Sequence, residues 1–178
     1  MKAVFLGRFQ PFHLGHQKVI EEYRAEYSLK IVIGSAGKSR TEENPLTAEE
    51  REKIIRECYP DIEILYKEDH ESDKQWIKDL EEEVEADIII SQNGLVKRLV
   101  ENHIDMSLIE QELYDEDIYS GTEIRRRIKS GEEWRYLVPD CAVEQVDRVE
   151  EIIKKSGIQY EFEPGWKKEN AFHGTADN

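Results

Sequence analysis

Short apolar runs alternate with amphipathic stretches along most of the chain, and this alternation predicts the order of strands and helices. Nearly unbroken apolar runs at 3–6, 29–33 and 86–91 are typical of strands buried inside a parallel sheet. The run at 62–66 alternates apolar with polar side chains, so we expect it nearer an edge of the sheet. A fifth strand is predicted at 106–113.

Between these runs, apolar side chains recur at helical intervals. They predict helices in six places: from 14 to about 27, from 47 onward, from about 76 to 84, at 95–100, from 120 onward, and at 143–153 with Gly157 after its end. Thr47 with Glu50 and Ser120 with Glu123 have the spacing of capping boxes, which mark helix starts. Strands that alternate with helices predict a doubly wound parallel α/β sheet, a Rossmann-like fold.

Length and patterning predict one domain over residues 1–156, followed by a polar tail at 157–178 that is flexible or docked on a neighbouring subunit. The formal net charge of -15 argues against a broad basic surface for nucleic acid. Cys58 and Cys141 lie far apart without a C-x-x-C motif, so we expect neither a disulfide framework nor a metal site, and a reducing interior fits them best. With no signal peptide and no apolar run as long as a membrane span, these features favour a cytoplasmic protein away from membranes.

The segment between the first strand and the first helix carries the candidate chemistry. It reads Gly-Arg-Phe-Gln-Pro-Phe-His-Leu-Gly-His over 7–16. Backbone N–H groups are unpaired at a helix start and the helix dipole is positive there, so anions are favoured. Arg8, His13 and His16 beside such a terminus suit a polyphosphate. Zinc binding by the two histidines lacks a third ligand at a familiar spacing, and a role in capping and packing stays open.

These ten residues resemble the G-R-F-Q-P-F-H-x-G-H signature of the archaeal-type nicotinamide-nucleotide adenylyltransferases, which belong to the nucleotidylyltransferase superfamily. A second segment, at 120–125, resembles the superfamily motif S-x-T-x-x-R, which binds ATP phosphates. Arg126 and Arg127 follow it but point in other directions around the helix. The resemblance implies adenylyl transfer from ATP to nicotinamide mononucleotide, giving NAD⁺ and pyrophosphate. It implies catalytic roles for His13, His16 and Arg125, and ATP binding by Gly7, Arg8, Phe9, His13, Gly15, His16, Ser120, Thr122 and Arg125.

The same resemblance supplies residues for the nicotinamide nucleotide. Arg51 lies in a stretch similar to the family's N-P-[FL]-T-x-x-E-R, while Asp69, Asp73 and Trp76 match D-x-x-x-N-x-x-W with Asp73 where Asn is usual. Asn93 follows the strand at 86–91, where open α/β sheets bind ligands. From the residues alone, Arg51 could lie on a solvated helix face, Trp76 could pack against the sheet, and Asn93 could form a left-handed turn.

The resemblance further implies Mg²⁺ carried on the ATP phosphates without direct protein ligands, and a homo-oligomer that binds neither nucleic acid nor membrane. A polar loop at 36–44 with Lys38 and Arg40 either covers the site or is an ordinary surface loop. Two other functions stay open: transfer to another phosphorylated acceptor, such as nicotinate mononucleotide, flavin mononucleotide or phosphopantetheine, and nucleotide sensing without catalysis. The acidic segment 114–117 and Asp73 keep the sensor possible. A class I aminoacyl-tRNA synthetase is excluded, because the chain is short, acidic and lacks a K-M-S-K-S-like segment.

Overall fold

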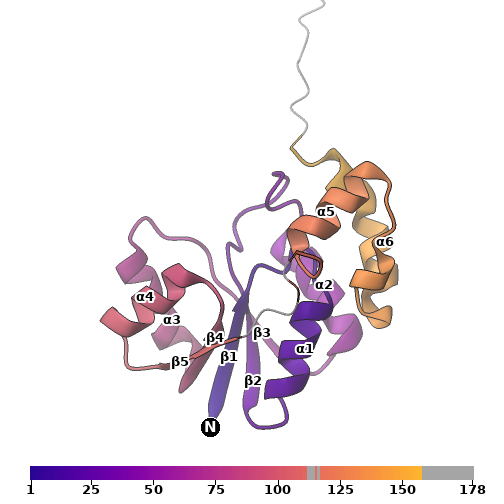
Figure 1. The fold of residues 1–178 in the computed structure, drawn as a ribbon. Helices are drawn as coiled ribbons and strands as arrows, with labels where there is room; N and C mark the ends of the chain where they lie inside the picture. Colours follow the sequence, from indigo (N-terminus) through magenta and orange to yellow (C-terminus); the bar gives the residue numbers. More distant parts are fainter. Residues whose placement is uncertain (112–114, 116, 158–178) are drawn as a thin grey trace, which may run out of the picture.

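Five parallel strands form the centre of the molecule (Figure 1). The computed structural model describes residues 1–111, 115 and 117–157. The strands are β1 (Lys2–Gly7), β2 (Ser28–Ile33), β3 (Glu63–Tyr66), β4 (Ile88–Ser91) and β5 (Ser107–Glu110), in the spatial order β3-β2-β1-β4-β5. The predicted strands are confirmed, including the edge position of β3. The strand predicted at 106–113 is shorter than expected, and its residues 112 and 113 lie outside the described residues, as do 114 and 116 of the acidic segment.

Helices cover both faces of the sheet, which confirms the doubly wound α/β fold. They are α1 (Leu14–Tyr23), α2 (Ala48–Cys58), α3 (Asp73–Val84), α4 (Gly94–His103), α5 (Gly121–Ser130), the 3-10 turn η1 (Arg135–Leu137) and α6 (Asp140–Lys155). In Figure 1, α3 and α4 lie on one side of the strands and α1, α2, α5 and α6 on the other. None of the helices in the described ranges is both long and apolar enough to cross a membrane.

Alternate residues of the central strands enter two separate cores. Ala3 and Phe5 of β1 pack into the core beneath α1, α2, α5 and α6, while Val4 packs into the core beneath α3 and α4. Ile31 and Val32 of β2 divide in the same way. Since successive strand side chains point to opposite faces, a strand buried on both faces needs apolar residues at every position. This requirement explains the unbroken apolar runs in the sequence.

A disulfide joins α2 to α6, and it corrects the expectation drawn from the cysteines. Cys58 ends α2 and Cys141 lies in the first turn of α6, with their Cα atoms 5.4 Å apart. The expectation that they would not pair is wrong because 83 residues separate them in sequence, and only the packing of α2 on α6 brings them together. The cysteines therefore no longer support a reducing environment.

Candidate active site

A cavity of about 580 Å³ opens at the carboxyl edge of the sheet. It lies where β1 and β4 are neighbours but continue into helices on opposite faces, which is the usual ligand position in open α/β sheets. The cavity brings together all the predicted site residues except Arg51. Those that line it are Gly7, Arg8, Phe9, His13, Gly15, His16, Asp69, Asp73, Trp76, Asn93, Ser120, Thr122 and Arg125.

His13 and His16 stack against each other at the start of α1. Their ring centroids are 3.7 Å apart, and the backbone N–H of His13 donates to Nδ1 of His16 at 3.2 Å. A ring nitrogen that accepts a hydrogen bond carries no proton, so the proton of neutral His16 is on Nε2. Nδ1 of His13 is buried without a hydrogen-bond partner among the described residues. A buried polar atom without a partner in the protein is typical of a site completed by a ligand.

Burial keeps both imidazoles neutral. It lowers the pKa of His13 to about 3. For His16, burial and then the charge of a protonated His13 lower the pKa well below the ordinary value of 6.5. At neutral pH the pair therefore offers uncharged N–H donors, and the positive charge near it comes from arginine.

Aromatic rings pack against the His16 ring. The Phe9 ring lies 4.5 Å from it between centroids, and Phe12 stacks on it at 5.8 Å. Phe9 is buried in the left-handed region with φ of 51°, an unusual conformation for a bulky side chain. A Cβ on Gly7 would lie only 2.8 Å from the Phe9 ring. Part of the long signature therefore specifies the packing that orients His16.

The start of α5 meets this loop from more than a hundred residues away. Ser120 caps the helix, its Oγ accepting from the Glu123 N–H at 3.2 Å. Arg125, only 8% exposed, donates from Nη1 to the Gln10 carbonyl at 2.7 Å and from Nη2 to Thr122 Oγ1 at 3.3 Å. Burial and then the nearby charge of Arg8 lower the Arg125 pKa. Two cationic side chains and two helix starts thus share one end of the cavity.

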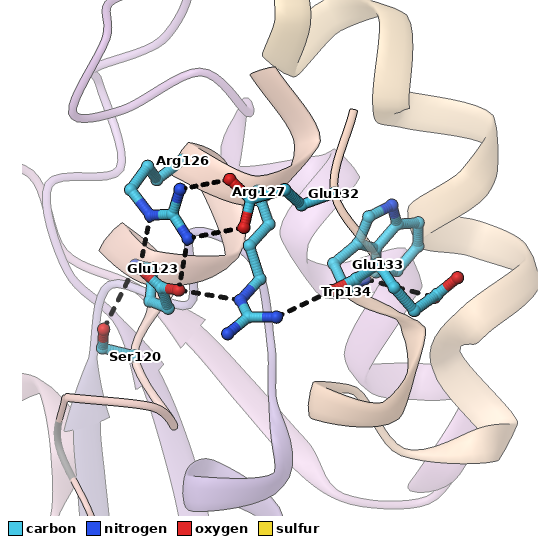
Figure 2. A network of polar contacts seen from close by, with 7 residues as sticks. All are labelled: Ser120, Glu123, Arg126, Arg127, Glu132, Glu133 and Trp134. Atoms are coloured by element: carbon cyan, nitrogen blue, oxygen red, sulfur yellow. Dashed lines mark hydrogen bonds and ion pairs between the residues drawn. The ribbon is translucent and has the colours of Figure 1, made fainter. Parts of the chain in front are cut away.

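Arg126 and Arg127 do not line the cavity, as their helical positions predict. Figure 2 shows them bound instead to acidic residues of the same region. Arg126 donates to Glu123 from Nε at 2.7 Å and from Nη2 at 2.8 Å, and also binds Glu132. Arg127 donates from Nε to Glu123 at 2.7 Å and from Nη1 to the Glu133 carbonyl at 3.0 Å. The two guanidinium groups hold the pKa of Glu123 at about 2. Of the three consecutive arginines, Arg125 is the one that faces the cavity.

Arg51 does not line the cavity but lies fully buried behind it. Its guanidinium donates to the backbone carbonyls of Arg8 at 2.9 Å and Gly34 at 2.8 Å, and to those of Thr47 and Ser35. Burial lowers its pKa to about 10, so it stays charged at neutral pH. The structure thus supports neither a solvated helix face nor the expected approach to substrate. The loops after β1 and β2 leave carbonyls without sheet partners, and Arg51 satisfies them.

The opposite end of the cavity is built from α3, α4 and the loops before them. Asp69 accepts from Ser35 Oγ at 3.0 Å and pairs with Lys38 Nζ at 2.8 Å. Trp76 is half-buried, and it both packs against the core beneath α3 and lines the cavity. Asn93 caps α4 with φ of -71°, so the left-handed turn considered for it is wrong. Lys38 lines the cavity, which places part of the loop at 36–44 at the site.

Comparison with known proteins shows the family of this chain. Residues 4–131 match the cytidylyltransferase-like family model. A nicotinamide-nucleotide adenylyltransferase of Halobacterium salinarum is 36% identical over 160 residues, covering 85% of this chain and 90% of the relative. One from Methanolobus tindarius is 35% identical over 164 residues, covering 88% and 94%. The chain belongs to the nicotinamide-nucleotide adenylyltransferase family.

A solved structure supports the fold of this family member. The bifunctional NMN adenylyltransferase/ADP-ribose pyrophosphatase of Francisella tularensis, crystallised with AMP and a manganese ion, superposes with a TM-score of 0.67 at 18% identity. The match covers 87% of this chain but only 51% of that one, so the chain spans about half the length of that protein. At this identity, the likeness shows the shared fold alone.

Sequence reasoning missed several cavity-lining residues of this adenylyltransferase family member, among them Gln10, Ser35 and His70. The side-chain amide of Gln10 binds the backbone of Leu46 in both directions, at 2.9 and 3.0 Å, and so fixes the loop that carries His13. Ser35 and His70 lie shortly after β2 and β3. The rule that ligands gather beyond the carboxyl ends of parallel strands could have found both of them.

Proposed function

We propose that this chain transfers the adenylyl group of ATP to nicotinamide mononucleotide, giving NAD⁺ and pyrophosphate. One observation carries the proposal: Arg125 of the second motif bonds to Gln10 of the first, so both phosphate motifs form one end of a single cavity. Trp76 and Asn93 line the other end, on the opposite face of the sheet. Two substrates entering from the two faces would meet above β1 and β4.

The ATP phosphates would lie across the starts of α1 and α5. Arg8 and Arg125 would hold the β- and γ-phosphates, and Nε2–H of His16 would donate to a non-bridging oxygen of the α-phosphate. A phosphate oxygen of the mononucleotide attacks the α-phosphorus in line, and the bond to the bridging oxygen of pyrophosphate breaks. Because the attacking phosphate is already ionised at neutral pH, no general base is needed, and catalysis comes from positioning and charge neutralisation.

We propose that Mg²⁺ accompanies ATP, bound by its phosphates. Among the described residues, no group of three or more His, Cys, Asp or Glu side chains could hold a metal ion. The carboxylates that line the cavity, Asp69 and Asp73, are on the α3 side, so the phosphate end supplies cations and N–H groups. A divalent ion carried by the phosphates fits this lining. It would neutralise charge on the α-phosphate and the leaving pyrophosphate.

The test is direct synthesis. Purified protein is incubated with ATP, Mg²⁺ and nicotinamide mononucleotide, with nicotinate mononucleotide and flavin mononucleotide in parallel, and the products are separated by chromatography. We expect NAD⁺ with an equal amount of pyrophosphate. His16→Ala should lower kcat by about 10²–10³, as loss of an oxyanion donor does elsewhere. His103→Ala, at the far end of α4, is the matched control and should keep full turnover.

Other outcomes would select other functions. ATP binding by calorimetry without any dinucleotide product would indicate a nucleotide sensor. A product only with flavin mononucleotide would indicate a different acceptor. A folded His16→Ala protein with nearly full turnover would leave the mechanism without its main donor, and the assignment of His16 would then be wrong.

We also infer a homo-oligomer that acts in the cytoplasm, without nucleic acid or membrane as a partner. The net charge of -15 supports the absence of a nucleic-acid surface. Light scattering would measure the oligomeric state, and a monomer at micromolar concentration would contradict the first part of this inference.

A further inference from the structure

The end of the cavity that Trp76 and Asn93 line is called the acceptor end here, because the mononucleotide would bind there. It carries a negative charge that no neighbouring side chain balances. Lys38, Asp69 and Asp73 are the charged side chains that line this end. Lys38 and Asp69 form an ion pair with each other at 2.8 Å. The carboxylate of Asp73 has no ion-pair or hydrogen-bond partner within the described part of the chain. At neutral pH, these three groups leave one net negative charge, on Asp73.

His70 also lines this end but adds no compensating charge in the arrangement seen. Its Nδ1 accepts a hydrogen bond from the Ser72 backbone N–H at 2.9 Å. An imidazole nitrogen that accepts cannot also carry a proton, so His70 is neutral while this bond is kept. The charge of Asp73 therefore stands alone on this wall.

Asp73 lies one helical turn from the aromatic wall. It is the first residue of α3, and Trp76 follows three positions later, so the two side chains lie on the same face of the helix. Trp76 uses its Nε1–H for the Glu68 carbonyl at 2.9 Å, which leaves the part of the indole that lines the cavity for contact with a planar ring. A pyridine ring stacked on Trp76 would carry its 3-substituent into the region of Asp73.

We propose that Asp73 makes this site select nicotinamide mononucleotide over nicotinate mononucleotide. The inference rests on the proposed function. A carboxamide presents an NH₂ group that donates to the Asp73 carboxylate, whereas nicotinate presents a second carboxylate to it. Discrimination of this kind comes from repulsion of the wrong substrate as well as attraction of the right one.

The test compares kcat/KM for the two mononucleotides in the wild type and in Asp73→Asn, which removes the charge at nearly constant shape. The wild type should prefer the nicotinamide nucleotide. In Asp73→Asn the preference should fall about tenfold, mainly because the nicotinate nucleotide is used better, as expected for loss of one partly screened like-charge contact. The KM for ATP should not change, since ATP binds at the other end.

Glu82→Gln is the matched control, because Glu82 lies exposed on the same helix and its loss changes the net charge equally. It should keep the wild-type preference, whereas a general effect of charge would move both variants. Higher salt should also weaken the wild-type preference, because it screens an exposed charge, and leave Asp73→Asn unaffected. A structural role for Asp73 at the helix start predicts neither result.

An unchanged preference in active Asp73→Asn, or a wild type that favours the nicotinate nucleotide, would overturn the inference. If Asp73→Asn does not fold, Asp73→Ser decides in its place. If the wild type forms no dinucleotide with either acceptor, the proposed function fails. Calorimetry then decides the inference separately, because wild-type protein should still bind the nicotinamide nucleotide more tightly and Asp73→Asn should lose that difference.

Discussion

At the scale of single residues, His13 and His16 act at neutral pH as uncharged donors. The hydrogen bond onto Nδ1 of His16 fixes its tautomer, and burial removes the alternative of a protonated ring. The cationic charge at the phosphate end comes from Arg8 and Arg125, which stay charged at every physiological pH. Geometry and charge are thus supplied by different side chains, so the electrostatic field at the phosphates is insensitive to pH near neutrality.

The same burial makes stability depend on pH. In the unfolded chain histidine titrates near 6.5, whereas in the fold the pKa of His13 is about 3. Between these values the unfolded chain binds more protons than the folded chain. The free energy of unfolding therefore has its full value above pH 6.5 and falls as the pH drops toward 3. One histidine contributes a slope of up to about 1.4 kcal/mol per pH unit. Urea unfolding between pH 7.5 and 4.5 should show a shallower loss in His13→Gln than in the wild type.

His103→Gln serves as the control for that experiment, because His103 lies at the end of α4, away from the His13–His16 pair. It should lose stability with falling pH in parallel with the wild type. Identical slopes for His13→Gln and the wild type would show that His13 is accessible to protons in the folded state.

Gly121 is a second residue whose substitution should act on the site. A Cβ there would lie 2.7 Å from the Gln10 carbonyl oxygen and 3.1 Å from Arg125 Nη1. Because the nearest atom is backbone, Gly121→Ala should move α5 away from the loop, raise the KM for ATP at least about tenfold and cost about 1–3 kcal/mol of stability. Steady-state kinetics and urea unfolding would measure both effects.

Gly94→Ala is the matched control, since its Cβ would meet only Arg98 Nη1 at 3.9 Å, an ordinary contact at the start of α4. It should leave the KM for ATP and the stability nearly unchanged. A Gly121→Ala protein with wild-type ATP kinetics would show that the contact between α5 and the loop is not needed to hold Arg125.

At the scale of elements, Arg51 ties α2 to the loops after β1 and β2. Arg51→Lys keeps the charge but loses the planar fork that reaches several carbonyls at once. It should lower the free energy of unfolding by about 2–4 kcal/mol, because buried carbonyls lose their partners. Arg148→Lys, at an exposed ion pair on α6, should cost less than about 0.5 kcal/mol. Equal losses would contradict the structural role of Arg51.

Local signals in the sequence predicted these elements well, while contacts between elements escaped them. Thr47 and Ser120 were expected to start helices, and both accept the backbone N–H three residues later. Such caps depend on four adjacent residues, so the sequence contains everything they need. The placement of Arg51 depends on two loops elsewhere in the chain, and its position one turn into α2 gives no sign of them. The resemblance to the family assembled most of the cavity lining, and Arg51, which it also named, lies buried behind that lining.

At the scale of the whole molecule, the disulfide closes a loop of 83 residues that contains Asp69, Asp73, Trp76 and Asn93 of the acceptor end. In the chain-entropy model, a loop of this length stabilises the fold by about 4–5 kcal/mol. Urea unfolding with and without reductant should therefore show a large loss of stability on reduction. The Cys58→Ser/Cys141→Ser double variant should resemble the reduced wild type and no longer respond to reductant. A wild type that reductant leaves unchanged would mean that the cysteines are not paired in solution.

This cross-link also shows the limit of reasoning along the sequence. Two cysteines without a local motif gave no reason to expect a bond, because their distance depends on how α2 and α6 pack against the same core. The fold class was predictable because it follows from periodicity repeated in every element. A single pair of side chains has no such repetition.

The placement of the two cavity ends on opposite helix layers has a consequence for protein engineering. Residues 63–103 form one continuous stretch, β3 through α4, and carry Asp69, Asp73, Trp76 and Asn93. The histidine loop and α5 lie outside it and pack mainly into the other core. This stretch can therefore be exchanged as a unit. Replacing it with the matching stretch of a relative would change the preferred acceptor nucleotide and leave the residues that bind the triphosphate unchanged.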